Sequence, residues 1–367
     1  MQLVAVEFPV IFFLIAALYW VVPYTSQNTI RFGVRIPPNR MHDPILVYFN
    51  ALYRKRLEFA TISIFFALIV VPTLFGAYQI ELAAIFSEII FAHVFFVLAH
   101  HSLARVKKER GWYQGIKEAA GIIILENNST DRGDKIYSAL LAMSALIIAA
   151  TAIMGALMDS RILAQINILA EEGEATGLVY SSSLLNAFSI SIAQTFLTAL
   201  LALLSYVIMR SRQELEVFRP RTSYVQQYKF KRYTRYTIMA SSIMINISFL
   251  LIAIIGWGLL NKSYSSLISY LPLSSLLVFF LPMILLGQQG SHIKVDFEED
   301  YTSLANRNDD QYWKGGIFYF NPGDSSFVVA NRFGVGWSMN FGNPLTWVVI
   351  SFVVVGFLLT GVFFNAL

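Results

Sequence analysis

Eight apolar runs dominate this sequence of 367 residues, and each has the length of a membrane span. A helix needs about 20 consecutive apolar residues to cross the hydrocarbon core of a bilayer. The runs cover residues 3–22, 57–78, 80–104, 136–158, 184–209, 237–260, 268–286 and 345–366. Charged residues make up only 14% of the chain, against about 25% in soluble domains. The sequence therefore predicts an all-α polytopic membrane protein with about eight transmembrane helices.

The positions of the basic residues predict the orientation of these helices. Of the 27 Lys and Arg residues, 25 lie in the connections 23–56, 105–135, 210–236 and 287–344, and only Arg161 and Lys262 lie on the other side. By the positive-inside rule the basic connections face the cytoplasm. We therefore expect a multi-pass protein of the cytoplasmic membrane with both termini outside. The first run has no basic segment before it and no cleavage site after it, so we expect it to be retained.

Short extended segments in the basic connections predict a small β-rich cytoplasmic cap. The runs IFYF and SFVV flank the turn sequence NPGD, which predicts a β-hairpin, and VGWSMNF predicts a third strand. Residues 121–125 and 30–37 predict further strands. The tetrapeptide RFGV occurs at 31–34 and again at 332–335, which favours two edge strands of one cap over an internal duplication. The predicted parts are 1–287 with helices one to seven, the cassette 288–344, and the last helix 345–367.

The cassette carries a recognisable pattern, YWKGGIFYFNPGD followed by RFGVGWSMNFGNP and an apolar helix. It resembles a domain-of-unknown-function cassette of bacterial multi-pass membrane proteins. The residues that fit are Trp313, Gly315, Tyr319, Asn321, Pro322, Asp324, Arg332, Gly334, Gly336, Trp337, Asn340 and Pro344. The resemblance implies a module without an assigned activity.

A second stretch, residues 165–185, is distantly similar to an outside loop of SdpI-like immunity membrane proteins. Ile166, Ile168, Gly173 and Glu174 fit that loop, whereas other residues stand where its proline and histidine are expected. The similarity implies protection against a toxin or an antimicrobial peptide.

Polar residues inside the apolar runs are the other candidate sites. Glu88 and His93 lie in the third run. An ionisable group within a span can mark a functional site such as a proton relay, but for both residues a hydrogen bond between helices is the favoured interpretation. For Asn186, Gln194 and Asn246 we favour hydrogen bonds between helices. The chain has no cysteine, and no metal-binding, nucleotide-binding or hydrolase motif is present. The sequence predicts no catalytic residue, no metal and no cofactor.

The basic and aromatic stretch 224–236 fits a juxtamembrane anchor for anionic lipid better than a nucleic-acid surface, so no nucleic-acid partner is expected. The leading hypothesis is a non-enzymatic protein for envelope sensing, or for immunity or resistance to an antimicrobial peptide or toxin. Acidic residues around 159–174 would attract a cationic peptide outside, and a protein partner would bind the cap inside. The alternatives are a secondary transporter coupled through Glu88 or His93, and a membrane assembly or structural factor.

Overall fold

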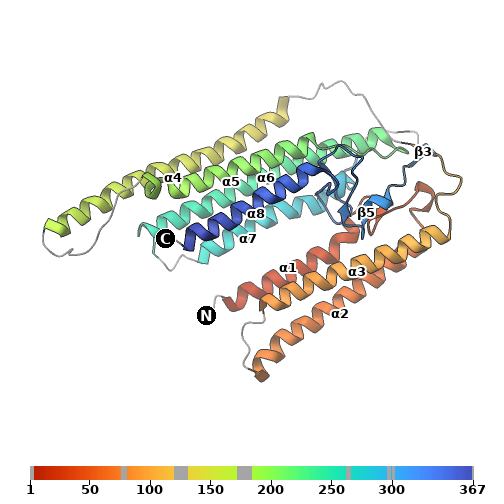
Figure 1. Cartoon of the computed structure of the whole chain (residues 1–367), viewed down its shortest axis with the longest axis horizontal. Helices are drawn as coiled ribbons and strands as arrows, with labels where there is room; N and C mark the ends of the chain where they lie inside the picture. Colours follow the sequence, from red (N-terminus) through yellow and green to blue (C-terminus); the bar gives the residue numbers. More distant parts are fainter. Residues whose placement is uncertain are drawn as a thin grey trace. The chain divides into compact units, whose positions relative to one another are not determined.

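The computed structural model describes residues 4–75, 81–119, 131–171, 184–261, 266–295, 299 and 302–365. This part of the chain is mostly helical, as the sequence predicts (Figure 1). Its eight α-helices are α1 (Val4–Thr25), α2 (Pro44–Phe75), α3 (Glu81–Glu109), α4 (Asp131–Glu171), α5 (Leu184–Arg210), α6 (Pro220–Gly256), α7 (Ser266–Leu286) and α8 (Pro344–Asn365). The largest differences from the predicted runs are at the starts of α2 and α6 and at the end of α4, because each helix continues past the charged residues that bound its apolar run.

The prediction of eight spans is supported only in a coarser form. Within the described residues, four helices are long and apolar enough to cross a membrane. They are Leu82–Glu109, Lys135–Met158, Phe188–Arg210 and Pro220–Gly256. Ile11–Thr25 and Ser274–Gly290 are apolar but shorter. The described residues thus form eight helices at the predicted places, and four of these helices meet the length and hydropathy of a membrane span.

The chain divides into two compact units. The second unit covers 125–210 and 231–282, in which α4 packs on α5. Polar side chains join its other helices: Gln194 Nε2 donates to the carbonyl oxygen of Asn246 at 2.9 Å, and Asn246 Nδ2 donates to Thr198 Oγ1 at 3.0 Å. Both predicted polar residues therefore link α5 to α6. Asn186 also lies in α5, but its side chain lies outside the described part.

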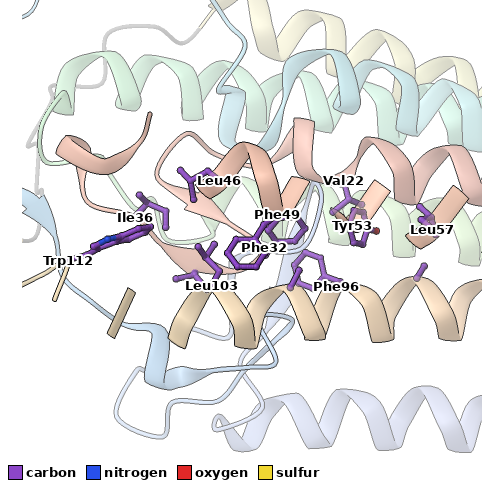
Figure 2. Close-up of a cluster of buried hydrophobic side chains, with 13 residues drawn as sticks. Val22, Phe32, Ile36, Leu46, Phe49, Tyr53, Leu57, Phe96, Leu103 and Trp112 are labelled. Atoms are coloured by element: carbon purple, nitrogen blue, oxygen red, sulfur yellow. The ribbon is translucent and has the colours of Figure 1, made fainter. Parts of the chain in front are cut away.

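The first unit covers 1–124, 211–230 and 283–367. Its helix α2 packs on α3, and α1 contacts both. An apolar cluster fills the space between these helices and the connection that follows α1 (Figure 2). Phe32, Tyr53, Leu57, Phe96 and Leu103 are its most buried large members.

The polar connections of the first unit, residues 26–43, 105–119, 211–219 and the described part of 287–343, form what we call the cap. Its strands are only two or three residues long: β1 (Ile30–Arg31) pairs antiparallel with β2 (Val34–Arg35), β3 (Glu118–Ala119) pairs parallel with β4 (Ala305–Asn306), β5 (Trp313–Lys314) pairs antiparallel with β6 (Phe318–Tyr319), and β7 (Val328–Ala330) pairs antiparallel with β8 (Trp337–Met339). Strand pairs near the C-terminal end of the chain are confirmed.

The predicted hairpin across NPGD is wrong. Phe318 pairs back with Lys314 around Gly315 and Gly316, whereas Val328 pairs forward with Met339. Both glycines have positive φ, 60° and 74°, a conformation that glycine adopts without steric cost and that tight hairpins need. The extended segment near Trp337 was predicted correctly as β8, and residues 121–125 lie outside the described part.

Candidate functional site

The first RFGV segment forms the turn of the hairpin β1–β2. Phe32 and Gly33 occupy the two turn positions with φ of 48° and 74°, as a type I′ turn requires. A phenylalanine in this conformation costs about 1–2 kcal/mol. Burial offsets the cost, because the Phe32 ring lies 5.4 Å from the ring of Tyr53 and 5.6 Å from that of Phe96. The segment is therefore a tight turn and not the predicted edge strand.

The second RFGV segment lies in the loop between β7 and β8, and it meets the first. Arg332 Nη1 donates a hydrogen bond to the carbonyl oxygen of Gly33 at 3.0 Å. The rings of Phe32 and Phe333 both contact Phe96, whose centroid is 4.6 Å from that of Phe333. The repeated tetrapeptide thus lies in two loops that are far apart in the sequence, and both loops contact Phe96 of α3.

A cluster of six charged side chains, with buried cations and partly exposed acids, surrounds this meeting point. We call it the charge cluster, and its members are Arg35, Lys107, Glu214, Asp309, Asp310 and Arg332. Arg35 pairs with Glu214 and, at 2.8 Å, with Asp309, while Arg332 pairs with Asp309 and, at 2.7 Å, with Asp310. Three positive and three negative groups give formal neutrality.

The cluster joins four connections and not the three predicted for the cap. Lys107, in the last turn of α3, donates to Asp310 at 2.6 Å and to Asn308 at 2.8 Å. Glu214 adds the connection between α5 and α6. The sequence analysis singled out only Arg332 among the six. The adjacent acids of DDQYW and the second arginine of RFGVR were the available signals.

The arginines set the protonation state of the acids. Burial by itself raises the pKa of Asp309, but the charges of Arg332 and Arg35 outweigh it and hold that pKa well below its usual value. The same balance lowers the pKa of Asp310, where burial opposes the charges of Arg332 and Lys107. Both carboxylates are therefore ionised at neutral pH. This arrangement suits a structural latch, because every described charge in it has an opposite charge beside it.

The cassette residues form a second hydrogen-bonded group around Asn340. The Asn340 side chain is fully buried, and its Nδ2 donates to the carbonyl oxygens of Asn321, Asp324 and Ser326 at 3.0, 2.9 and 3.2 Å. Its Oδ1 accepts from the backbone N–H of Asn321 at 3.0 Å. Tyr319 donates its hydroxyl proton to Asp324 at 2.9 Å, and burial raises the Tyr319 pKa to about 12. These hydrogen bonds hold the turn at Pro322 in place.

The remaining cassette residues lie on both sides of this group. Trp313 is buried beneath the guanidinium of Arg332, whose Cζ is 5.0 Å from the ring centroid. Gln288, which the sequence analysis missed, accepts from the N–H of Gly336 at 2.7 Å and donates to its carbonyl oxygen at 2.9 Å. Trp337 packs on Phe230 at 5.4 Å. Gly334 lies in the same loop with φ of 68°, and Pro344 begins α8.

A polar cleft of about 710 Å³ opens beside the charge cluster. Glu214 and Asp309 of the cluster line it together with Tyr319 and Asp324 of the cassette. At its edge Arg212 pairs with Asp324 at 3.0 Å and is more than half exposed. The cleft can therefore take up a polar ligand or a partner's side chain next to the latch.

The two ionisable candidates inside α3 do not contact each other through hydrogen bonds. Glu88 is fully buried, and its Oε1 accepts from the hydroxyl of Thr61 in α2 at 2.7 Å. His93 Nδ1 lies 3.2 Å from the hydroxyl of Tyr19 in α1. Each residue thus connects α3 to a different helix. Among the described side chains, no group of three or more His, Asp or Glu is placed to hold a metal ion.

Comparisons with known proteins match only the C-terminal segment. Residues 322–347 match a family of unknown function, DUF5808. No curated protein and no solved structure matches the chain, and no match shows the similarity to SdpI-like immunity proteins. The segment that matches contains Asp324, Arg332 and Asn340, and it supports the predicted C-terminal cassette of unknown function.

Proposed function

We propose that this protein is a non-enzymatic, multi-pass protein of the cytoplasmic membrane that responds to an antimicrobial peptide or toxin at the envelope and passes the response to the cap. The observation that supports the proposal most directly is the charge cluster. It ties the end of α3 to the connection after α1 and to the segment before α8. The cap in this proposal faces the cytoplasm, and all eight helices cross the membrane.

Separating the charges of the cluster is costly. Removing one partner of a buried ion pair costs about 3–5 kcal/mol. A peptide that shifts α1 or α3 would therefore switch the cap between two arrangements, latched and open, and would not move it gradually through intermediate positions. Opening would free Asp309 and Glu214, which already line the cleft, for a partner protein.

Deletion of the gene tests this proposal. The deleted strain should become more sensitive to cationic peptides or to the cell's own toxin, and the intact gene should restore resistance. Arg332→Gln, which opens the cap, should give the response without any peptide although the protein still reaches the membrane. Arg40→Gln, at an exposed position of the cap outside the cleft, should restore the normal response. Unchanged sensitivity of the deleted strain would remove the support for sensing and immunity. A stably bound partner without any response to peptides would favour an assembly factor.

One observation favours a second candidate, a proton-coupled transporter. Oε2 of Glu88 is buried and has no hydrogen-bond partner among the described residues, which is costly for a carboxyl group inside a membrane protein. Binding and release of a proton by Glu88 during transport would explain why a buried carboxyl group is present at this position. Glu88→Gln should then abolish proton-driven flux in proteoliposomes, and Glu58→Gln, at an exposed position of α2, should not. Equal flux in all three proteins would exclude the coupling role of Glu88.

A further inference from the structure

An apolar groove lies between α1 and α2. Its volume is about 350 Å³, within the range of about 300–1,000 Å³ typical of ligand pockets. Phe13, Leu57 and Ile62 contribute apolar walls, and the small side chain of Ala17 leaves room between the helices. Both helices contain apolar runs that the sequence predicts to span the membrane.

One end of the groove is polar. The indole N–H of Trp20 donates to Glu58 at 2.9 Å, and the guanidinium carbon of Arg54 lies 4.1 Å from the centroid of the Trp20 ring. Nε of Arg54 is buried and has no hydrogen-bond partner among the described residues. Trp20 is near the end of α1, and Arg54 precedes the apolar part of α2, so both lie where the predicted membrane boundary falls.

The polar end carries a net positive charge. Lys55 and Arg56 follow Arg54 directly and both are exposed, and these three cations outnumber the one acid there, Glu58, which lines the groove. Basic clusters beside a membrane helix attract anionic lipids, with about 1 kcal/mol for each Lys or Arg near the surface. A tryptophan at the same level is typical of the layer of lipid head groups. Apolar walls with one cationic end match an amphiphile that has a single negatively charged head.

We propose that this groove binds an anionic phospholipid, with one acyl chain between α1 and α2 and the phosphate beside Arg54 and Trp20. The inference rests on the membrane placement in the proposed function and goes beyond it by naming a ligand class and a site. A zwitterionic phospholipid offers the same chains, but its head group carries no net negative charge for the net positive charge of residues 54–58 to attract.

The site also has a route to the interior of the bundle. Thr61 lines the groove, and its hydroxyl donates the hydrogen bond to Glu88 on α3. An acyl chain in the groove would contact the side chain that carries this hydrogen bond. Lipid binding is thereby linked to Glu88, the buried carboxyl group that couples protons in the transport alternative.

Native mass spectrometry of the purified full-length chain tests the proposal. The protein is mixed with phosphatidylglycerol or with phosphatidylcholine of identical acyl chains, and retained lipid is counted. The intact protein should retain phosphatidylglycerol preferentially. Arg54→Gln should weaken that preference about fivefold, the equivalent of about 1 kcal/mol, and Arg105→Gln, an exposed cation of α3, should not. Ala17→Phe, which fills the groove, should reduce retention of both lipids.

Quenching by brominated lipid gives a readout that does not depend on a variant with a filled groove. Phosphatidylglycerol with bromine on its chains should quench part of the tryptophan fluorescence, and that part should disappear in Trp20→Phe. No preference for phosphatidylglycerol, or full retention in Ala17→Phe, would overturn the inference while leaving the membrane placement intact. Recovery of the protein in the aqueous fraction without detergent would instead overturn the membrane placement itself.

Discussion

Arg332 donates a hydrogen bond to the carbonyl oxygen of Gly33, 299 positions away in the chain, and this contact joins the two copies of one tetrapeptide. The guanidinium reaches Gly33 because the hairpin β1–β2 turns its carbonyl toward the last loop. The same guanidinium binds Asp309 and Asp310. The Arg332 side chain thus connects the hairpin β1–β2, near the start of the chain, to Asp309 and Asp310 near its end.

Replacing Arg332 should open the cap. Arg332→Gln leaves two buried carboxylates short of positive charge and should lower the free energy of unfolding of the first unit by about 3–5 kcal/mol. Arg212→Gln is the matched control, because the Arg212 side chain is more than half exposed and its ion pair with Asp324 should contribute less than about 1 kcal/mol. Chemical denaturation in detergent measures both. Equal effects of the two variants would contradict the role of the charge cluster as a latch.

Gly33 should tolerate no side chain, because the cap backbone approaches it closely. A Cβ at Gly33 would lie 2.5 Å from the carbonyl oxygen of Gly316. Gly115 has nearly the same φ, 73° against 74°, but nothing lies within 4 Å of its would-be Cβ. Gly115→Ala should therefore cost only the conformational term of about 1–2 kcal/mol, and Gly33→Ala should cost clearly more. Melting temperatures of the two variants give the comparison, and similar losses would show that the close approach is unimportant.

The positions of the helices could be predicted from the sequence because each apolar run is a local signal. The start of α7 differs by only two residues from the predicted run, since membrane helices must satisfy their backbone hydrogen bonds within themselves. The α2 helix begins earlier than predicted, at Pro44, because Arg54, Lys55 and Arg56 interrupt the apolar run within one continuous helix and a search for uninterrupted apolar runs starts only after them.

The cap could be predicted only as a region. Its strands have two or three residues each, so hydrogen bonds from side chains such as Asn340 and Gln288 replace a regular ladder, and these carry no periodic signal. The partners of Arg35 are 179 and 274 positions away, beyond the reach of any local pattern. The turn signal of NPGD was real, but the adjacent Gly315 and Gly316 made a tighter hairpin available to Phe318.

The aromatic edge of the cap should lie in the head-group layer of the membrane. Phe318 and Phe320 are 54% and 44% exposed on either side of buried Tyr319, and Trp347, in the first turns of α8, is 55% exposed. A single cysteine at Phe320 should react with a water-soluble maleimide more slowly in inside-out vesicles than in detergent, since interfacial lipid covers aromatic residues. A cysteine at the exposed Ser303 of the cap is the control, and equal slowing at both would contradict the placement.

The stability of the first unit should fall with acid in a way that Asp309 controls. Although burial opposes it, the positive charge of Arg332 and Arg35 lowers the pKa of Asp309 below its usual 3.8 in the folded protein. The unfolded chain therefore takes up a proton at a higher pH than the folded protein does. The contribution of Asp309 is fully present above pH ~5 and is lost as the pH falls through ~4 toward the lower folded pKa.

Melting temperatures measured from pH 7 to pH 3 check this expectation. The decline below pH 5 should be shallower in Asp309→Asn than in the intact protein, because the variant has no carboxylate to protonate at that position. Asp310→Asn should flatten the acid limb as well, since its pKa is lowered in the same manner, and the double variant should be flatter than either. The slopes are compared and not the absolute melting temperatures, because each variant also leaves an arginine with one negative partner fewer. Parallel acid limbs in all four proteins would mean that other carboxylates govern the acid unfolding of this unit.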